Sequence, residues 1–174
     1  MHDPDKRFAL RMIPYGVFVV TAINPATMDA AGVTIHWLTQ TSFTPCLLAA
    51  CVKSDHPTIN IIRQTRRFAI NMLGKEDAGE AFTFARPAIL TGNLNTDTAR
   101  LGGWGVSWGR RGNILLQNAV AVLECDLRAM MEAGDHYPLI AEVADAHVRL
   151  PPDGRPDDMS LRMSELGQTI FYGG

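Results

Sequence analysis

The chain has 174 residues, of which 47% are hydrophobic, so its length and composition predict one domain over residues 1–174 with a sizeable core. Its 16 Lys and Arg residues nearly balance 18 Asp and Glu residues, and a net charge of -2 argues against a nucleic acid or a membrane as partner. The polar, acidic N-terminus is unlike a secretory signal, and three cysteines at no framework spacing indicate reduced thiols in a cytoplasmic protein.

The N-terminal part of the chain predicts a helix followed by a hairpin. Asp and Pro at positions 3 and 4 form a good helix start, and Pro14 ends the helix. A β-branched run at residues 17–22 is a strong strand signal, and the chain returns through residues 31–38. The turn residues at 24–27 lie between these two runs, which therefore predict a hairpin.

The next part of the chain alternates apolar runs with short helical patterns. Residues 47–52 form a continuous apolar run of strand length, which predicts a strand buried on both faces. Residues 55–58 resemble a helix start, and arginines near the end of that helix suit its dipole. Another strand is predicted at 68–73 and a further helix at 76–84.

The C-terminal half predicts more strands around one unusual segment. Residues 85–113 are rich in Gly and Pro and predict a long irregular segment with one short helix. Strands are predicted at 119–130 and 138–150, with a turn at 134–136 between them, and a last short strand at 168–172. Many β runs with few short helices, and no regular β-α-β alternation, favour a mainly β fold, an antiparallel barrel with helical decorations.

Several common site motifs are absent from the sequence. There is no Gly-x-Gly-x-x-Gly turn for a dinucleotide, no phosphate-binding Gly-x-x-x-x-Gly-Lys loop and no hydrolase elbow. No Cys-x-x-Cys occurs, and the five histidines lack a paired spacing for a metal ion, so no metal site is expected.

The most informative stretch is residues 32–45, which is dense in hydroxyl and amide side chains between apolar runs. Such a stretch presents backbone N–H and C=O groups to a planar ligand, and an isoalloxazine ring needs both at its pyrimidine end. The apolar end of the ring would then lie against Trp37 or Leu38. On its residues alone the stretch is more simply a polar strand and turn between two core strands, so both interpretations stay open.

The same stretch carries a resemblance to a known family. Its Gly-x-Thr beginning and its Thr-Ser-Phe-Thr-Pro end resemble the signature of the flavin reductase-like, FMN-binding split-barrel family. The resemblance continues, in order, at Lys53-Ser54 and Thr58, at residues 68–73 and 123–125, at Gly134-Asp135-His136 and at residues 171–174. It covers most of the chain and implies a split β-barrel, an antiparallel Greek-key barrel that binds FMN as a homodimer.

The resemblance also implies where the flavin lies. The residues expected to line the ring, largely through backbone groups, are Thr34, His36, Trp37, Leu38 and Thr39. Thr41 and Ser42 are expected to contact the ribityl chain or the ring edge, and Lys53, Ser54 and Thr58 to hold the phosphate. Chemistry supports the last group independently, since a dianionic phosphate suits a cation, hydroxyl donors and a helix start. A solvated lysine beside an ordinary helix cap is the competing interpretation.

His136 is the candidate catalytic residue. In the family the Gly134-Asp135-His136 turn approaches the flavin, so His136 is expected to contact the nicotinamide, and Asp135 is expected to be structural. The implied activity is that of an NAD(P)H-dependent FMN reductase, in which hydride passes from nicotinamide C4 to flavin N5 without a catalytic acid or nucleophile. A partner oxygenase or another electron acceptor would use the product.

Two alternatives stay open. One is a non-catalytic FMN electron-transfer protein that receives electrons from a protein partner, and the other is a related barrel that binds heme or a different flavin such as FAD. The sequence departs from the family pattern at His36-Trp37, at Cys46, at Ala141 and over residues 92–112. This last segment includes Trp104 and Trp108, which would cover the ligand or pack on a partner subunit.

Overall fold

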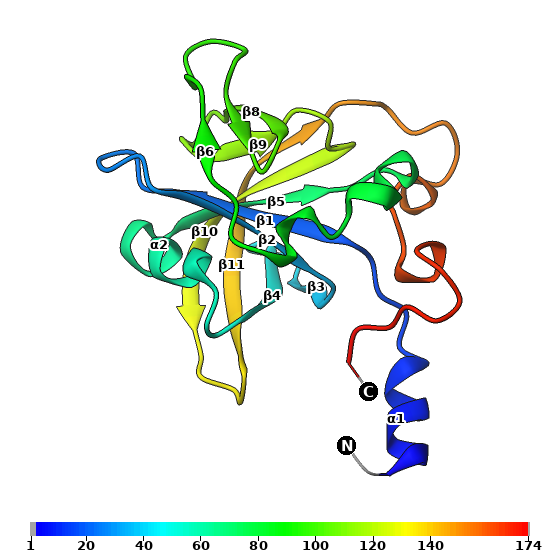
Figure 1. The fold of residues 1–174 in the computed structure, drawn as a ribbon. Coiled ribbons are helices and arrows are strands. Elements are labelled where there is room, and N and C mark those ends of the chain that lie inside the picture. The colour runs from blue at the N-terminus through cyan, green and yellow to red at the C-terminus, as the bar shows by residue number, and fades with distance from the viewer. Residues whose placement is uncertain (1–2, 174) are drawn as a thin grey trace.

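A seven-stranded antiparallel sheet forms the body of the molecule in the computed structural model, which describes residues 3–173 (Figure 1). The strands lie in the order β2, β1, β5, β10, β11, β4 and β3. Their bounds are β1 Phe18–Ile23, β2 Ala30–Ile35, β3 Leu38–Ser42, β4 Leu47–Lys53, β5 Arg67–Met72, β10 Ala121–Met130 and β11 His136–Val148. The curled, antiparallel sheet confirms the predicted fold class, the half-open barrel of a split-barrel protein.

Strand β1 separates two hydrophobic cores. Successive residues of a strand point to opposite faces, so Val19 lies in one core and Val20 in the other. Helix α2 (Pro57–Thr65) covers the second core, where Ile59 and Ile62 are buried. Pro57 at the first helical position and Arg66 in the left-handed conformation after the last turn set the bounds of this helix.

A small second sheet covers the first core. Its strands are β6 (Leu90–Thr91), β7 (Arg100–Leu101), β8 (Trp104–Trp108) and β9 (Ile114–Leu116). The expectation of an irregular segment with a short helix at 85–113 was therefore wrong. Gly102 and Gly103 have positive φ angles of 58° and 90°, which form the tight turn between β7 and β8, and Trp104 is buried behind it.

A buried asparagine joins the two sheets. The Asn71 side-chain amide donates to the Val19 carbonyl at 2.9 Å, and its oxygen accepts from the Leu116 N–H at 2.8 Å. The Thr21 hydroxyl donates to the Ile114 carbonyl at 2.5 Å and accepts from the same amide group of Asn71 at 3.0 Å. Because these buried groups are all paired, they fix the position of β9 on the large sheet.

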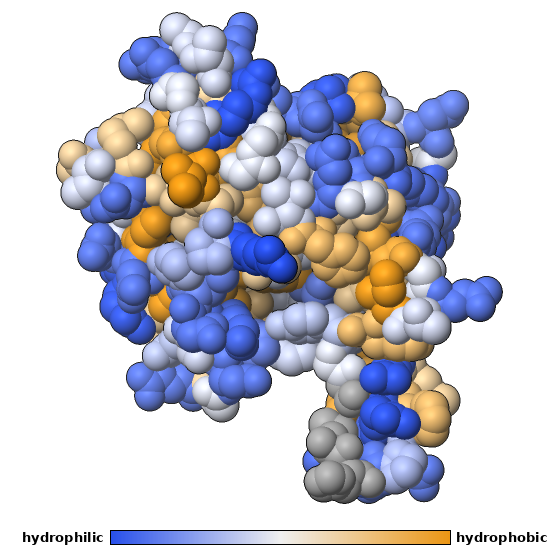
Figure 2. Space-filling model, in the orientation of Figure 1, coloured by the Kyte–Doolittle hydropathy of each residue, from blue (hydrophilic) through white to orange (hydrophobic). Residues whose placement is uncertain are grey.

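Helix α1 (Pro4–Arg11) stands out from this body, with Asp3 as its N-cap as predicted (Figures 1 and 2). It buries none of its residues, and the C-terminal segment descends beside it. No helix within residues 3–173 is long and apolar enough to cross a bilayer.

Two local predictions were wrong. The single helix expected at 76–84 is two 3-10 helices, η1 (Lys75–Glu80) and η2 (Thr83–Ala85). Asp77 accepts the Gly74 N–H at 2.9 Å, which closes a tight turn, and Gly79 weakens any longer helix. The strand expected at 168–172 is an irregular segment, because its side chains contact α1 and the aromatic residues of the barrel instead of a strand edge. Two short 3-10 helices, η3 (Pro156–Asp158) and η4 (Met163–Glu165), precede it.

Candidate functional site

The pairing of β4 with β11 brings two predicted site groups together. His136 lies opposite Lys53 in the ladder, and the Ser54 N–H donates to the Asp135 carbonyl at 2.9 Å. His136 is the first residue of β11, one position beyond the turn, and only 8% of it is exposed. A buried histidine and an exposed cation therefore share one end of the sheet, next to the start of α2.

The groups around the start of α2 differ in exposure. Lys53 and Ser54 are exposed, and the Lys53 ammonium lies 3.2 Å from an Asp55 carboxylate whose side chain is also mostly exposed. An exposed ion pair of this kind contributes little to stability, so another anion can readily replace Asp55 beside the Lys53 ammonium. Thr58 is fully buried, with its hydroxyl 2.9 Å from His56 Nδ1, so its hydroxyl is not free at the surface.

His56 is a residue of this region that the sequence prediction missed. It is the N-cap of α2, where its Nδ1 accepts the Thr58 N–H at 3.3 Å. Burial lowers the pKa of His56 below its ordinary value, which favours the neutral ring. A neutral ring with Nδ1 as acceptor carries its proton on Nε2. The signal in the sequence was its place directly before Pro57, since Pro favours the first helical position.

An aromatic cluster lies on the other side of His136. The Trp37 ring centroid is 4.7 Å from that of His136, 5.3 Å from Tyr172 and 6.4 Å from Tyr15. The His36 ring lies 4.7 Å from Tyr172. These five residues come from the segment before β1, from the β2–β3 connection, from β11 and from the C-terminal segment, so only the tertiary structure brings them together.

Both histidines of this cluster have defined partners. His36 is buried and its Nδ1 lies 3.2 Å from the Gly16 carbonyl, and burial lowers the pKa of His36. His136 Nδ1 lies 2.7 Å from Asp135 Oδ1, and its Nε2 lies 2.7 Å from the Tyr172 hydroxyl. The sequence analysis included Tyr172 in a predicted strand and in the C-terminal end of the resemblance, but it did not predict the contact with His136.

The other predicted residues do not all face this cluster. The Thr34 hydroxyl donates to the Ala81 carbonyl at 2.8 Å, toward the segment after η1. Thr41 is exposed and Ser42 is half-buried at the end of β3. Leu38 and Thr39 line a groove instead, while the backbone of Trp37 is held to β4 by a 3.0 Å hydrogen bond from the Cys51 N–H.

That groove is large and mostly apolar, with a volume of about 660 Å³. It lies at the edge of the second core, against which Phe18, Leu123 and Val143 pack, and it reaches the segment that follows β11. Its apolar lining comes from six strands and this segment and includes Phe18, Leu38, Leu47, Leu123, Val143 and Leu150. A surface of this kind is typical of a binding or association site.

Two buried nitrogens at the site lack a hydrogen-bond partner within residues 3–173. They are Trp37 Nε1, beside the aromatic cluster, and His56 Nε2, at the start of α2. A buried N–H group without an acceptor costs about 1–3 kcal/mol, so each nitrogen suits a ligand acceptor. Together with the Lys53 ammonium, the Ser54 hydroxyl and a helix start, this donor set fits a planar, acceptor-rich ring joined to a phosphate.

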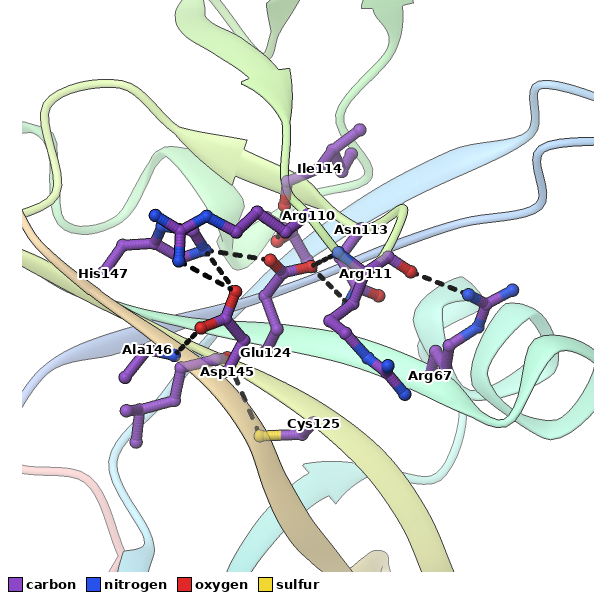
Figure 3. Close-up of polar contacts among 12 residues, drawn as sticks. Arg67, Arg110, Arg111, Asn113, Ile114, Glu124, Cys125, Asp145, Ala146 and His147 are labelled. Carbon is purple, nitrogen blue, oxygen red and sulfur yellow. Dashed lines mark hydrogen bonds and ion pairs between the residues drawn. The ribbon is translucent and has the colours of Figure 1, made fainter.

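A second polar cluster surrounds the buried Glu124 (Figure 3). One carboxylate oxygen accepts from the Arg111 N–H at 3.1 Å and from the Asn113 amide at 3.0 Å, and the other lies 2.9 Å from His147 Nε2. Glu124, Asp145 and His147 offer ligand atoms within 4.8 Å of one another, which is close enough for a metal ion. The same atoms already form ion pairs and hydrogen bonds with protein groups. The cluster therefore has a structural role as well, because it anchors the β8–β9 turn to β10 and β11.

The chain is similar to known proteins over most of its length. The family model described as the flavin reductase like domain matches residues 10–161. A flavin reductase from Pseudomonas putida is 28% identical over 142 residues, which are 82% of this chain and 78% of that protein. The reductase component of a 4-nitrophenol 4-monooxygenase/4-nitrocatechol 2-monooxygenase from Rhodococcus opacus is 31% identical over 157 residues, which are 90% of this chain and 76% of that protein.

Solved structures are similar as well. The NADH:FAD oxidoreductase of Streptomyces globisporus superposes with a TM-score of 0.67 at 28% identity, over 85% of this chain and 86% of that one. Some curated relatives are much longer, and this chain covers 38% of one and 25% of another.

The neutral His56 cap predicts a pH dependence of stability. The pKa of His56 in the folded protein lies below 6.5, its ordinary value in the unfolded chain. Between the folded and the unfolded pKa the unfolded chain binds more protons, so the free energy of unfolding falls as the pH drops through this range. His56→Asn keeps a capping acceptor that does not titrate. We expect its unfolding free energy, from urea titrations between about pH 7 and about pH 5, to fall less steeply than that of the wild type. Identical slopes would contradict a neutral, capping His56.

Proposed function

Since the chain belongs to the flavin reductase-like family, we propose that it binds FMN and catalyses the reduction of flavin by NADH or NADPH. The observation that carries this proposal is the β4–β11 register, which places His136 beside both the cationic start of α2 and the aromatic cluster of Trp37. The proposed ring site and the proposed phosphate site would thus be adjacent, as FMN requires. Relatives named flavin reductase and NADH:FAD oxidoreductase support the reaction class.

The phosphate would lie at the start of α2. The Lys53 ammonium supplies the positive charge, and the Ser54 hydroxyl and the His56 Nε2–H supply hydrogen-bond donors. Thr58 contributes indirectly, because its hydroxyl and its N–H hold the His56 ring in place. The helix start adds a favourable partial charge for an anion.

The flavin ring would lie along residues 36–42. Backbone groups there, together with the buried Trp37 N–H, would hold its polar edge, and Leu38 would contact its apolar edge. When bound, FMN supplies the hydride acceptor, which no side chain of the protein can provide. The protein would orient the two reactants and exclude water. Hydride transfer then needs no side chain that acts as an acid or a nucleophile.

His136 would orient the nicotinamide. The Asp135 carboxylate accepts a hydrogen bond from the His136 Nδ1–H, and this hydrogen bond lowers the pKa of Asp135. A neutral ring then keeps a lone pair on Nε2 that can accept an N–H of the nicotinamide carboxamide. The stacking of His136 on Trp37 fixes the plane of the imidazole.

A homodimer would complete the site. Helix α1 buries no residue, and Phe8 and Met12 on and after it are 55% and 80% exposed. The apolar groove is a second exposed hydrophobic surface, and its burial in an interface would be favourable. The two surfaces together suit a symmetric contact between copies of the chain.

The product, reduced flavin, would pass to an oxygenase. This part of the proposal draws on the Rhodococcus opacus relative, whose name describes the reductase component of a monooxygenase. The alternative is an electron-transfer protein that keeps FMN bound and receives electrons from a protein partner. Reduction of the bound flavin by a nicotinamide nucleotide distinguishes the two.

We expect Lys53→Ala to raise the Kd for FMN by about tenfold, because the lost charge-assisted hydrogen bond is worth about 1.5–3 kcal/mol. Titrations with FMN, FAD and riboflavin measure this, and riboflavin binding should not change because it has no phosphate. Lys75→Ala is a matched control, since Lys75 also pairs with a carboxylate, at 3.1 Å from Glu165. A similar loss of riboflavin affinity would contradict the phosphate role.

We expect His136→Ala to slow anaerobic bleaching of the flavin by NADH or NADPH by about tenfold, since it removes one hydrogen bond and the oriented ring. The Kd for FMN should change much less. The rates are measured by stopped-flow absorption at several nucleotide concentrations. Unchanged bleaching would exclude this role, and absence of bleaching in the wild type would favour the electron-transfer alternative.

We expect the protein to have a mass in solution of twice the 19.1 kDa of one chain. Light scattering on the eluate of a sizing column measures the mass directly. A mass of one chain at concentrations well above the range used for activity would contradict the dimer.

A further inference from the structure

Tyr172 forms a hydrogen bond with Nε2 of His136, the ring nitrogen that Asp135 leaves unpaired. The Asp135 carboxylate can only accept, so Nδ1 of His136 carries the ring proton, and Nε2 of the neutral ring then accepts the Tyr172 O–H at 2.7 Å. Burial raises the pKa of the Tyr172 phenol, which keeps that O–H protonated. Nδ1 is already paired with Asp135 at 2.7 Å. A neutral imidazole has one donor and one acceptor, so His136 has no hydrogen-bonding capacity left for a ligand in this arrangement.

We propose that Tyr172 occupies the position of the nicotinamide carboxamide, and that the hydride donor displaces the Tyr172 hydroxyl from His136 when it binds. This inference rests on the proposed function. The phenol O–H and the carboxamide N–H are both neutral donors, so they compete for the same lone pair. When the carboxamide replaces the phenol, Nε2 of His136 exchanges one hydrogen bond for a similar one. The hydrogen-bond free energy at this nitrogen therefore changes little.

The Tyr172 ring also covers the surface that a nicotinamide ring would need. It lies edge-on to Trp37, at an interplanar angle of 68°, and 4.7 Å from the His36 ring. A Cβ atom built on Gly173 would lie 3.3 Å from the Trp37 ring, so the segment rests directly on that ring. A planar ligand that stacked on Trp37 or His136 from this side would have to move Tyr172.

The C-terminal segment is held in a way that permits such movement. For the C-terminal segment, residues 167–173, the backbone hydrogen bond found within the described part of the chain runs from the Ile170 N–H to the Gly167 carbonyl at 3.3 Å, so both of its ends lie in the segment. The segment is otherwise held by side chains, such as Phe171 under the Arg11 guanidinium at 4.5 Å. A segment without backbone bonds to its surroundings opens at low free-energy cost.

There is also room for the displaced ring. A cavity of about 430 Å³ lies between α1 and the C-terminal segment, and Tyr172 forms part of its wall together with Tyr15 and Phe171. It is several times larger than a water molecule's share of liquid volume, about 30 Å³, so it can admit a phenol ring. Tyr172 can therefore leave His136 without unfolding the segments around it.

The test compares Tyr172→Phe with the wild type in steady-state flavin reduction by NADH and by NADPH. The variant keeps the ring and removes the competing hydroxyl. We expect the KM for the nucleotide to fall by about three- to tenfold, the range of one neutral hydrogen bond, with a smaller change in kcat. A residue that only supported the fold would raise KM or lower kcat.

Tyr137→Phe is the matched control. Tyr137 is the next residue of β11, and its hydroxyl donates to an exposed Glu132 carboxylate at 3.4 Å, away from His136. Its KM and kcat should equal those of the wild type. An unchanged or higher KM in Tyr172→Phe would overturn the inference.

A binding measurement separates this inference from the proposed function. Calorimetric titration of the oxidised, FMN-loaded proteins with NAD⁺ and NADP⁺ needs no hydride transfer. Tighter binding to Tyr172→Phe than to the wild type would support displacement, and equal affinities would contradict it. A wild type that neither nucleotide reduces would contradict the proposed reductase, whatever the result of this titration.

Discussion

The candidate site depends on the register between β4 and β11. In that register His136 pairs with Lys53, at the end of the ladder nearest to α2. A slip of one residue would turn each side chain of the strand to the other face, which would expose Leu139 and bury a charged group. The apolar residues on the inner face of β11 therefore fix the position of His136, and the core that stabilises the barrel also positions the candidate catalytic residue.

The chemistry of the site follows from groups that lack other partners. Trp37 and His56 present buried N–H groups without a partner within residues 3–173, and the Lys53 ammonium lies near the exposed carboxylates of Asp55 and Asp135. Such groups cost stability in the free protein and regain it when an anionic, acceptor-rich ligand binds. His136 is the opposite case, because Asp135 and Tyr172 satisfy both of its nitrogens. In the proposed function, the cofactor side of the site would thus be open to a ligand, whereas the substrate side is covered by Tyr172 of the chain itself.

Buried polar groups also explain why the long segment after η2 is ordered. Asn71 holds β9 by the Leu116 N–H, and Glu124 holds the turn before β9 by the Arg111 N–H and the Asn113 amide (Figure 3). A Cβ atom on Gly109 would lie 2.5 Å from the Glu124 carboxylate, so only glycine allows this approach. These contacts join residues far apart in the sequence, and no local pattern of residues 85–113 indicates them.

The sequence by itself determined the fold class, the family and most of the strands, because β-branched runs, turn residues and ordered motifs are local signals. It also placed Lys53, Ser54 and His136 in one site, although their roles there stay predictions. It was wrong for residues 76–84, 85–113 and 168–172, where propensity was weak and long-range contacts decided the conformation. Only the tertiary structure decided that Thr34 faces Ala81, that His56 caps α2 and that Tyr172 lies on His136. Each of these depends on a contact between segments that are apart in the chain or on the exact start of a helix, and neither is encoded in the periodicity of one segment.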